Sequence, residues 1–353
     1  MENSEILNKE NALPDITMTQ DGMFEHFRFA ADKGQKKIRV DKFLVDRIFD
    51  SSRSRIQAAA TVGCVRVDGV PVKSNYLVKP MQVVTIVMDR PRQSSEVVAE
   101  DIPINIVYED ETLMVVNKPA GMVVHPGHGN YTGTLVNALA WYLKGDPNYD
   151  ANDPRLGLVH RIDKDTSGLL VIAKTPEAKA NLGRQFFHKT TERKYEALVW
   201  GITKEDEIRI EGNIDRDPKD RLRMRVFPDG SQGKSAVTHC RTLARLGYVT
   251  WVECQLETGR THQIRAHMRY IGHPIFNDAR YGGSEILKGS TLGKYKQFVR
   301  NCFVVCPRQA LHAKTLGFTH PVTNERMSFD SPLPEDFQNL VDKWTAYVEQ
   351  NKR

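Results

Sequence analysis

Two apolar runs flank a polar loop in the middle of the chain. Residues 155–159 and 169–173 are rich in Leu, Val and Ile, and turn-forming residues bound the second run. This pattern predicts a short strand over 155–159 and a buried strand over 169–173. The loop between them carries Arg161 and Asp163. Catalytic groups are often presented on loops held by a rigid sheet, so Asp163 is a candidate reacting group. The alternative is a solvated turn with a local ion pair.

A small segment nearer the N-terminus alternates between helical and strand patterns. One helical face is expected from four apolar residues at helical spacing: Val40, Phe43, Leu44 and Ile48. Ser52 is suited to cap a second helix over 53–60, and Gly63 is suited to end it. Residues 65–70 then alternate around Asp68-Gly69, which predicts a hairpin turn. The segment therefore predicts two short helices followed by strands.

The remaining patterns set the expected domain boundaries. Residues 1–36 lack periodicity and are expected to be a disordered extension, so the small domain covers 37–88. Residues 89–100 are polar with Pro and Ser and are expected to be a linker. A second, larger domain is expected over 101–353. It should end in a helix that begins at residues 334–336 and packs through four apolar residues: Phe337, Leu340, Val341 and Trp344.

Composition narrows the class of protein. The chain has 353 residues, 40% hydrophobic and 27% charged, which is enough for two domains with proper cores. No apolar run approaches the length of a membrane span and the N-terminal segment is polar, so we expect neither a signal peptide nor a membrane anchor. Five cysteines without a framework spacing indicate reduced thiols, and hence a cytoplasmic protein.

The formal net charge of +6 is unevenly distributed. Residues 37–88 hold nine basic side chains against four acidic ones, so this segment can supply most of the surplus. A basic surface on a small domain is typical of phosphate contacts with a nucleic acid, although a solvated basic face has the same composition.

Three other chemistries lack the residues they need. The histidines and cysteines show no CxxC or HExxH spacing, so we expect no metal site. The glycines of residues 125–134 lack the GK[ST] ending of a phosphate-binding loop and are expected to form a flexible loop near the substrate. Asp163 and Asp165 are two residues apart on one short loop, so they cannot flank a sugar from opposite faces as glycosidase carboxylates do.

Several blocks along the chain resemble those of one enzyme family. The stretch 157–174, GLVHRIDKDTSGLLVIAK, is similar to the signature of the RluA-type RNA pseudouridine synthases. Further similar blocks follow the family's order: NKPAGMVVHPG (117–127), ERKYEALVWG (192–201), ETGRTHQIRAHM (257–268), HPIFNDARYG (273–282) and QALHAKTLGFTHPVTNE (309–325). Together they span roughly residues 105 to 332.

The resemblance implies an isomerase without cofactors that converts uridines of RNA to pseudouridine. It implies an α+β fold with a catalytic domain on a mixed, largely antiparallel sheet. It assigns catalytic roles to Asp163, Tyr195, Arg265 and Arg161. The substrate it points to is large-subunit ribosomal RNA or the assembling large subunit. The alternative from another class is a non-catalytic RNA-binding or ribosome-assembly protein with the same fold.

The chemistry of this reaction suits the assigned residue types. A carboxylate that works at neutral pH in a dry pocket needs a fixed cation, and a guanidinium stays charged when buried. Arg265 would supply that cation to Asp163, or could be a surface arginine. The ring of Tyr195 would stack on the extruded base, or could belong to the core with its hydroxyl at the solvent. Arg161 would fill the gap that the base leaves.

The small domain resembles the S4-like RNA-binding module. The resemblance rests on a basic helix, the sequence SRS at 52–54 and a GxVxVDG turn at 63–69. It implies phosphate contacts through four basic side chains: Lys42, Arg53, Arg55 and Arg66. RNA is therefore the expected partner. We expect the protein to be a monomer and to have no membrane partner.

Overall fold

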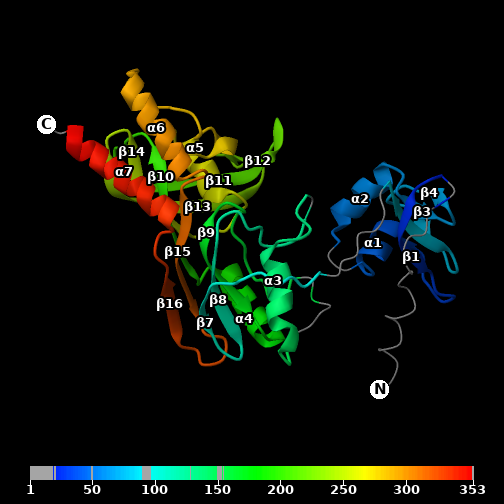
Figure 1. Ribbon diagram of the computed structural model, residues 1–353. Helices are drawn as coiled ribbons and strands as arrows, with labels where there is room; N and C mark the ends of the chain where they lie inside the picture. The colour runs from blue at the N-terminus through cyan, green and yellow to red at the C-terminus, as the bar shows by residue number, and fades with distance from the viewer. Residues whose placement is uncertain are drawn as a thin grey trace. The chain divides into compact units, whose positions relative to one another are not determined.

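The computed structural model describes residues 19, 21–48, 51–89, 97–127, 129–148, 153 and 155–351. The chain divides into two compact units, Met1–Ser95 and Glu96–Arg353 (Figure 1). No helix in the described ranges is both long enough and apolar enough to cross a membrane.

The N-terminal unit is built on a small antiparallel sheet with two short helices. The sheet has the order β1-β6-β3-β4, and β2 pairs separately with β5. The elements are β1 (Phe24–Ala30), β2 (Ile38–Arg39), α1 (Val40–Val45), α2 (Arg53–Thr61), β3 (Val65–Val67), β4 (Val70–Pro71), β5 (Leu77–Val78) and β6 (Val83–Met88). The predicted apolar face of the first helix is buried in the core of this unit.

The predicted caps and turn of this unit are confirmed. The Ser52 hydroxyl accepts a hydrogen bond from the Arg55 backbone N–H at 3.3 Å, which caps α2. Gly63 follows the helix with φ +76°. Asp68 and Gly69 both have positive φ, +49° and +82°, which is the conformation that a tight hairpin between β3 and β4 needs.

The prediction of a disordered extension over residues 1–36 is wrong for residues 24–30. These residues form β1, which pairs antiparallel with β6. Phe27 and Phe29 pack against the core of the unit, and the buried Glu25 accepts two hydrogen bonds from Arg28. Charged residues between the aromatic ones hid the strand pattern. Residues 1–18 and 20, and residues 90–96 of the expected linker, lie outside the described residues.

The C-terminal unit is built on a ten-stranded sheet. Its order is β12-β11-β13-β14-β10-β15-β9-β8-β7, with β16 paired to β15. The strands are β7 (Ile106–Glu109), β8 (Leu113–Lys118), β9 (Ser167–Ala173), β10 (Glu192–Trp200), β11 (Glu207–Asp217), β12 (Asp220–Phe227), β13 (Lys234–Leu246), β14 (Val249–Leu256), β15 (Leu311–Thr319) and β16 (Arg326–Asp330). Every pairing in it is antiparallel except that of β15 with β9, which confirms the predicted fold class.

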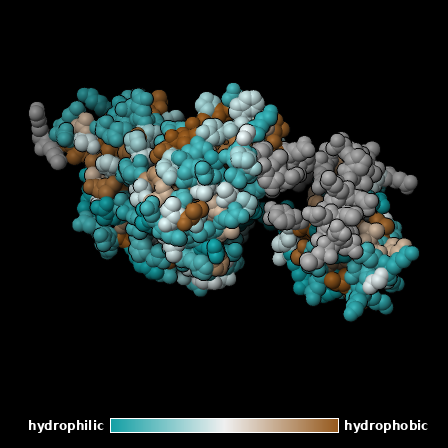
Figure 2. Space-filling model, turned by 90° about the horizontal axis from the view of Figure 1, so that it is seen from below, coloured by the Kyte–Doolittle hydropathy of each residue, from teal (hydrophilic) through white to brown (hydrophobic). Residues whose placement is uncertain are grey.

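Helices pack around this sheet (Figure 1). They are α3 (Leu135–Tyr142), α4 (Pro176–His188), α5 (Gln263–Tyr270), α6 (Gly293–Val305) and α7 (Glu335–Asn351), with 3-10 turns at Leu143–Gly145 and Ala279–Tyr281. The four apolar residues predicted to pack the terminal helix are all buried in α7. On the face drawn in Figure 2, hydrophilic side chains cover most of the larger unit, and its apolar surface is divided into small groups.

Of the two apolar runs that flank the polar loop, only one forms the strand that was predicted. The second is a buried strand, as predicted, and forms β9. The first is not a strand: residues 155–159 form a turn in which only Leu158 makes an isolated bridge, to Ile172. Leu156 and Gly157 have φ of +41° and +75°, values that no strand residue adopts.

Gly168 lets the polar loop reach the centre of the sheet. It has φ +117°, and a Cβ atom there would lie 2.2 Å from the carbonyl oxygen of Ala313. Only glycine can hold this close parallel approach of β9 to β15. The pairing places residues 160–166 beside the start of β15.

Candidate active site

The loop that carries Asp163 is held by two buried basic side chains, Lys118 and Arg308. The Lys118 amino group donates to the carbonyl oxygens of Pro119, Met122 and Lys164 at 2.6, 2.8 and 3.0 Å. The Arg308 guanidinium donates to the carbonyl oxygen of Asp165 at 3.0 Å. Arg308 is anchored in turn by two hydrogen bonds, at 2.7 and 2.9 Å, to the Asp336 carboxylate at the start of α7. The end of β8, the segment before β15 and the terminal helix therefore fix the loop.

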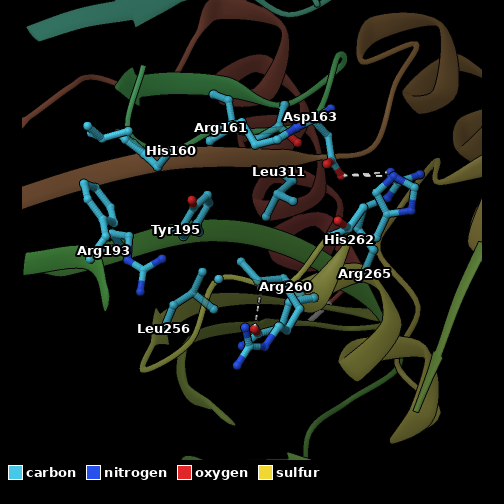
Figure 3. A pocket seen from close by; sticks show the side chains of 18 residues that line it. His160, Arg161, Asp163, Arg193, Tyr195, Leu256, Arg260, His262, Arg265 and Leu311 are labelled. Atoms are coloured by element: carbon cyan, nitrogen blue, oxygen red, sulfur yellow. Dashed lines mark hydrogen bonds and ion pairs between the residues drawn. The ribbon is translucent and has the colours of Figure 1, made fainter. Parts of the chain in front are cut away.

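Asp163 forms an ion pair with Arg265 (Figure 3). Arg265 Nη1 donates to Asp163 Oδ2 at 2.9 Å, and the two residues are 102 positions apart in the chain. Arg265 also makes two hydrogen bonds to the buried Asp278, from Nε at 2.7 Å and from Nη2 at 2.9 Å. The Asp163 side chain is 19% exposed, so it faces the cavity rather than the core.

The guanidinium of Arg265 is held in its charged form. Burial alone would lower the pKa of Arg265, but its hydrogen bonds to Asp278 and the charges of Asp278 and Asp163 outweigh burial and raise this pKa. The guanidinium also lies over the ring of Tyr281, with Cζ 4.9 Å from the ring centre. A fixed cation therefore stands beside the Asp163 carboxylate.

His262 is the second nitrogen-bearing neighbour of Asp163. It begins α5 with φ +53°, and its Nε2 lies 3.8 Å from Asp163 Oδ2. Its Nδ1 shares a hydrogen bond with the Tyr281 hydroxyl at 2.9 Å. Burial lowers the pKa of His262, which outweighs the opposite effect of the Asp163 charge. The imidazole is therefore neutral at physiological pH, and Arg265 is the cation that Asp163 meets.

Tyr195 and Leu311 form an apolar wall of the same cavity. Tyr195 lies on β10 and is 8% exposed, and Leu311 begins the neighbouring β15. Burial raises the pKa of the Tyr195 hydroxyl, so this group stays a neutral phenol. A planar ring could lie against Tyr195 while Asp163 reaches an atom attached to that ring.

The cavity has a volume of about 290 Å³ and is lined by both apolar and charged side chains. Arg161 lines it with an exposed side chain, while Ile162 is buried. Across the described residues no group of three or more His, Cys, Asp and Glu side chains could hold a metal ion. The reactive groups that line this cavity include a carboxylate, a phenol, two neutral imidazoles and guanidinium ions.

Known proteins with similar sequences decide the family. A family model described as RNA pseudouridylate synthase matches residues 112–270. A protein of Chlorobaculum parvum, named as an uncharacterized RNA pseudouridine synthase, is 45% identical over 313 residues, which cover 88% of this chain and 95% of that protein. The chain belongs to the RNA pseudouridine synthase family.

This RNA pseudouridine synthase, an isomerase, has further relatives. A ribosomal large subunit pseudouridine synthase D of Zymomonas mobilis is 42% identical, and the match covers 86% of this chain and 92% of that protein. A model of the S4 domain matches residues 38–84, within the N-terminal unit. The fold is shared with the human RNA pseudouridylate synthase domain containing 4, with a TM-score of 0.51 at 24% identity, over 68% of this chain and 92% of that one.

The structure brings four of the predicted site residues together. Asp163, Tyr195, Arg265 and Arg161 all line the one cavity. The predicted pairing of Arg265 with Asp163 is present, and the alternative of a surface arginine is wrong because its side chain is 8% exposed. The catalytic roles of these residues stay predictions.

The four basic residues of the N-terminal unit differ in their surroundings. Arg53 pairs with the buried Asp41 at 3.0 Å, and Arg66 pairs with Asp21. Lys42 and Arg55 are exposed and pair with no carboxylate in the described part of the chain. Phosphate contacts are therefore open to Lys42 and Arg55 without breaking an existing ion pair.

Sequence reasoning missed two side chains around Asp163. Asp278 orients Arg265, and His262 faces the Asp163 carboxylate. Both lie in stretches that resemble family blocks, 273–282 and 257–268, so the signal was present. Their contacts could not be read from spacing, because they depend on how α5 and the following 3-10 turn fold over the sheet.

Proposed function

We propose that the enzyme converts uridines of large-subunit ribosomal RNA to pseudouridine, with Asp163 as the catalytic carboxylate. The observation that carries this proposal is the 2.9 Å ion pair between Arg265 and Asp163 in a cavity walled by Tyr195. The substrate class is supported by relatives named as ribosomal large subunit pseudouridine synthases in Zymomonas mobilis and Neisseria meningitidis.

The reaction moves one bond within a nucleotide. The bond from ribose C1′ to N1 of uracil breaks, the base turns, and a bond from C1′ to C5 forms. The proton on C5 is lost and N1 gains one, so atoms and charge balance without a cofactor. The Asp163 carboxylate can act as a nucleophile at the sugar or as a base, and the adjacent guanidinium of Arg265 pairs with its negative charge.

Tyr195 holds the extruded base. Stacking on an aromatic side chain is a common way for base-modifying enzymes to keep a flipped nucleotide in place. The buried phenol is neutral, so its hydroxyl can lie near C5, where the proton is lost, without repelling a carboxylate. Confinement of the detached base favours its return to C1′ over escape.

Exposed basic residues position the RNA. Arg161, whose exposed side chain lines the cavity, fills the gap that the flipped base leaves in the RNA. Lys42 and Arg55 of the N-terminal unit contact phosphates, with Arg53 and Arg66 joining them if their carboxylate partners release them. The cavity is complete within one chain, so we expect a monomer. The enzyme acts in the cytoplasm, where ribosomal subunits are assembled and thiols stay reduced.

Mapping of pseudouridine in cells tests the proposed substrate. RNA is sequenced after pseudouridine-specific labelling in a strain that lacks the gene, complemented either with the wild type or with Asp163→Asn. We expect specific large-subunit sites to disappear without the gene and to return only with the wild type. Sites that change only in transfer RNA would contradict the ribosomal assignment. Return of the sites with the Asn variant would contradict the role of Asp163.

A further inference from the structure

Arg193 is a buried cation that faces the active-site cavity. It lies on β10, two residues before Tyr195, and is 7% exposed. Both residues line the same cavity as Asp163. Figure 3 shows Tyr195 between Arg193 and Asp163 in this view, with the guanidinium of Arg193 turned into the cavity. The charges of Arg193 and Asp163 both act on the Tyr195 hydroxyl, so the tyrosine lies near both groups.

Arg193 has no anionic partner in the described part of the chain. Among the described residues no carboxylate lies within ion-pair distance of it, and its buried Nε makes no hydrogen bond. Its guanidinium lies over the ring of Phe186, with Cζ 5.5 Å from the ring centre. Burial lowers the pKa of Arg193, and this outweighs the opposite effect of the nearby Tyr195 hydroxyl. An uncompensated buried charge costs stability, which indicates a role in binding a ligand.

The residues around Arg193 leave space for its guanidinium. A Cβ atom at Gly259 would lie 2.6 Å from Arg193 Nη1, so the glycine provides the space that the guanidinium occupies. His160 stacks on Phe186 at 4.4 Å, and its Nε2 accepts a hydrogen bond from the Val171 N–H at 3.0 Å. Burial, together with the charge of Arg193, lowers the pKa of His160 to about 3, so this imidazole is neutral.

We propose that Arg193 binds a carbonyl oxygen of the target uracil and stabilises the negative charge on the base after the glycosidic bond breaks. This rests on the proposed function. Residues i and i+2 of a strand share a face, so a base stacked on Tyr195 with its sugar at Asp163 points its far edge toward Arg193. When the bond from C1′ to N1 breaks, the electron pair stays on uracil and spreads over N1 and the two carbonyl oxygens. Asp163 carries no positive charge, either as a free carboxylate or as an ester at C1′, so it cannot stabilise this anion.

Rate and affinity measurements test this assignment against a phosphate contact. Arg193→Met keeps the apolar stem and removes the charge. Loss of one donor to a developing oxyanion reduces rates by about 10² to 10³ fold, so we expect that loss in the single-turnover rate at saturating RNA. RNA affinity and its salt dependence should stay within a few fold of wild type. Arg300→Met, on the exposed face of α6 outside the cavity, is the matched control with an unchanged rate.

Two further readouts separate binding of the base from a structural role. Removal of an unpaired buried cation should leave the melting temperature of the RNA-free protein equal or higher, whereas a structural role would lower it. RNA with 2-thiouridine or 4-thiouridine at the target position replaces one carbonyl oxygen by sulfur, a weaker acceptor. One of the two should slow the wild type markedly and slow Arg193→Met much less.

Defined results would overturn the assignment. An unchanged rate with weaker binding and a salt slope flatter by about one would show a phosphate contact instead. Sulfur substitution that slows the wild type and Arg193→Met equally would also refute it. So would a lower melting temperature of Arg193→Met together with an Arg193→Lys variant whose rate is not restored. Asp163→Asn is assayed in parallel: an active Asn variant refutes the proposed function, while an inactive one with a normal Arg193→Met refutes only the role of Arg193.

Discussion

Arg265→Met is the substitution that separates the charge of Asp163 from its position. In the wild type one guanidinium serves two carboxylates, through one hydrogen bond to Asp163 and two to the buried Asp278. Methionine fills most of the same space and leaves the two carboxylates facing each other without a cation. We expect activity to fall almost completely, because like charges in one site disfavour ionisation of both.

The structural cost of this change follows from burial. Asp278 is 1% exposed, and removal of one partner of a buried ion pair costs about 3–5 kcal/mol. For a unit of this size each kcal/mol corresponds to roughly 2–4 °C in melting temperature, so we expect a fall on the order of 10 °C. Arg265→Met combined with Asp278→Asn removes the stranded carboxylate. It should recover much of the stability and none of the activity.

The pH dependence gives the decisive assay. Loss of a nearby cation raises the pKa of a carboxylate, so the acidic limb of the pH–rate profile should move to higher pH in any residual activity of Arg265→Met. Arg265→Lys keeps a positive charge without the planar guanidinium. The acidic limb of its pH–rate profile should lie between those of the wild type and Arg265→Met. An unchanged limb with near-normal activity would refute the reasoning. So would recovery of full activity in the stability-restored double variant.

Two further predictions concern the RNA-binding unit and the sheet. Replacement of Lys42 and Arg55 by Gln should flatten the slope of log affinity against log salt by roughly 1.4 to 1.8, at about 0.7 to 0.9 per phosphate contact, with the rate at saturating RNA unchanged. An unaltered slope would remove both from the interface. Gly168→Ala forces a methyl group to within 2.2 Å of the Ala313 carbonyl oxygen at φ +117° and should destabilise the fold by about 3 kcal/mol or more. A melting curve equal to that of the wild type would contradict this account of the β9–β15 pairing.

Local patterns in the sequence were sufficient where the cause of the structure is local. Ser52 caps α2, Asp68-Gly69 form the turn, and the apolar face of α7 is buried as its spacing predicts. The strand β1 was not predicted because a polarity pattern places Glu25 at the surface. In the structure Glu25 is buried and accepts hydrogen bonds from Arg28. The turn at 155–159 was not predicted because positive φ at a leucine has no sequence signature.

The site itself could be predicted only in part, for a physical reason. Asp163 was a candidate from its place on a loop between two apolar runs, and its pairing with Arg265 was expected from the resemblance. The two residues are 102 positions apart and meet only after β9, β10 and α5 assemble. Asp278 and Arg193 are ordinary charged residues in sequence, one in a turn and one in a strand. Their importance lies in burial and in the presence or absence of a partner, which only the folded chain determines.

The central claim, that Asp163 carries the chemistry, is tested most directly by the turnover of Asp163→Asn. Asparagine keeps the size and the hydrogen-bonding capacity of the side chain and removes its charge. Pseudouridine formed per enzyme is followed over time by mass spectrometry at saturating RNA, with RNA affinity measured in parallel. The account predicts no turnover above the background from deamidation, with affinity close to that of the wild type. Multiple turnover by the asparagine enzyme would contradict it.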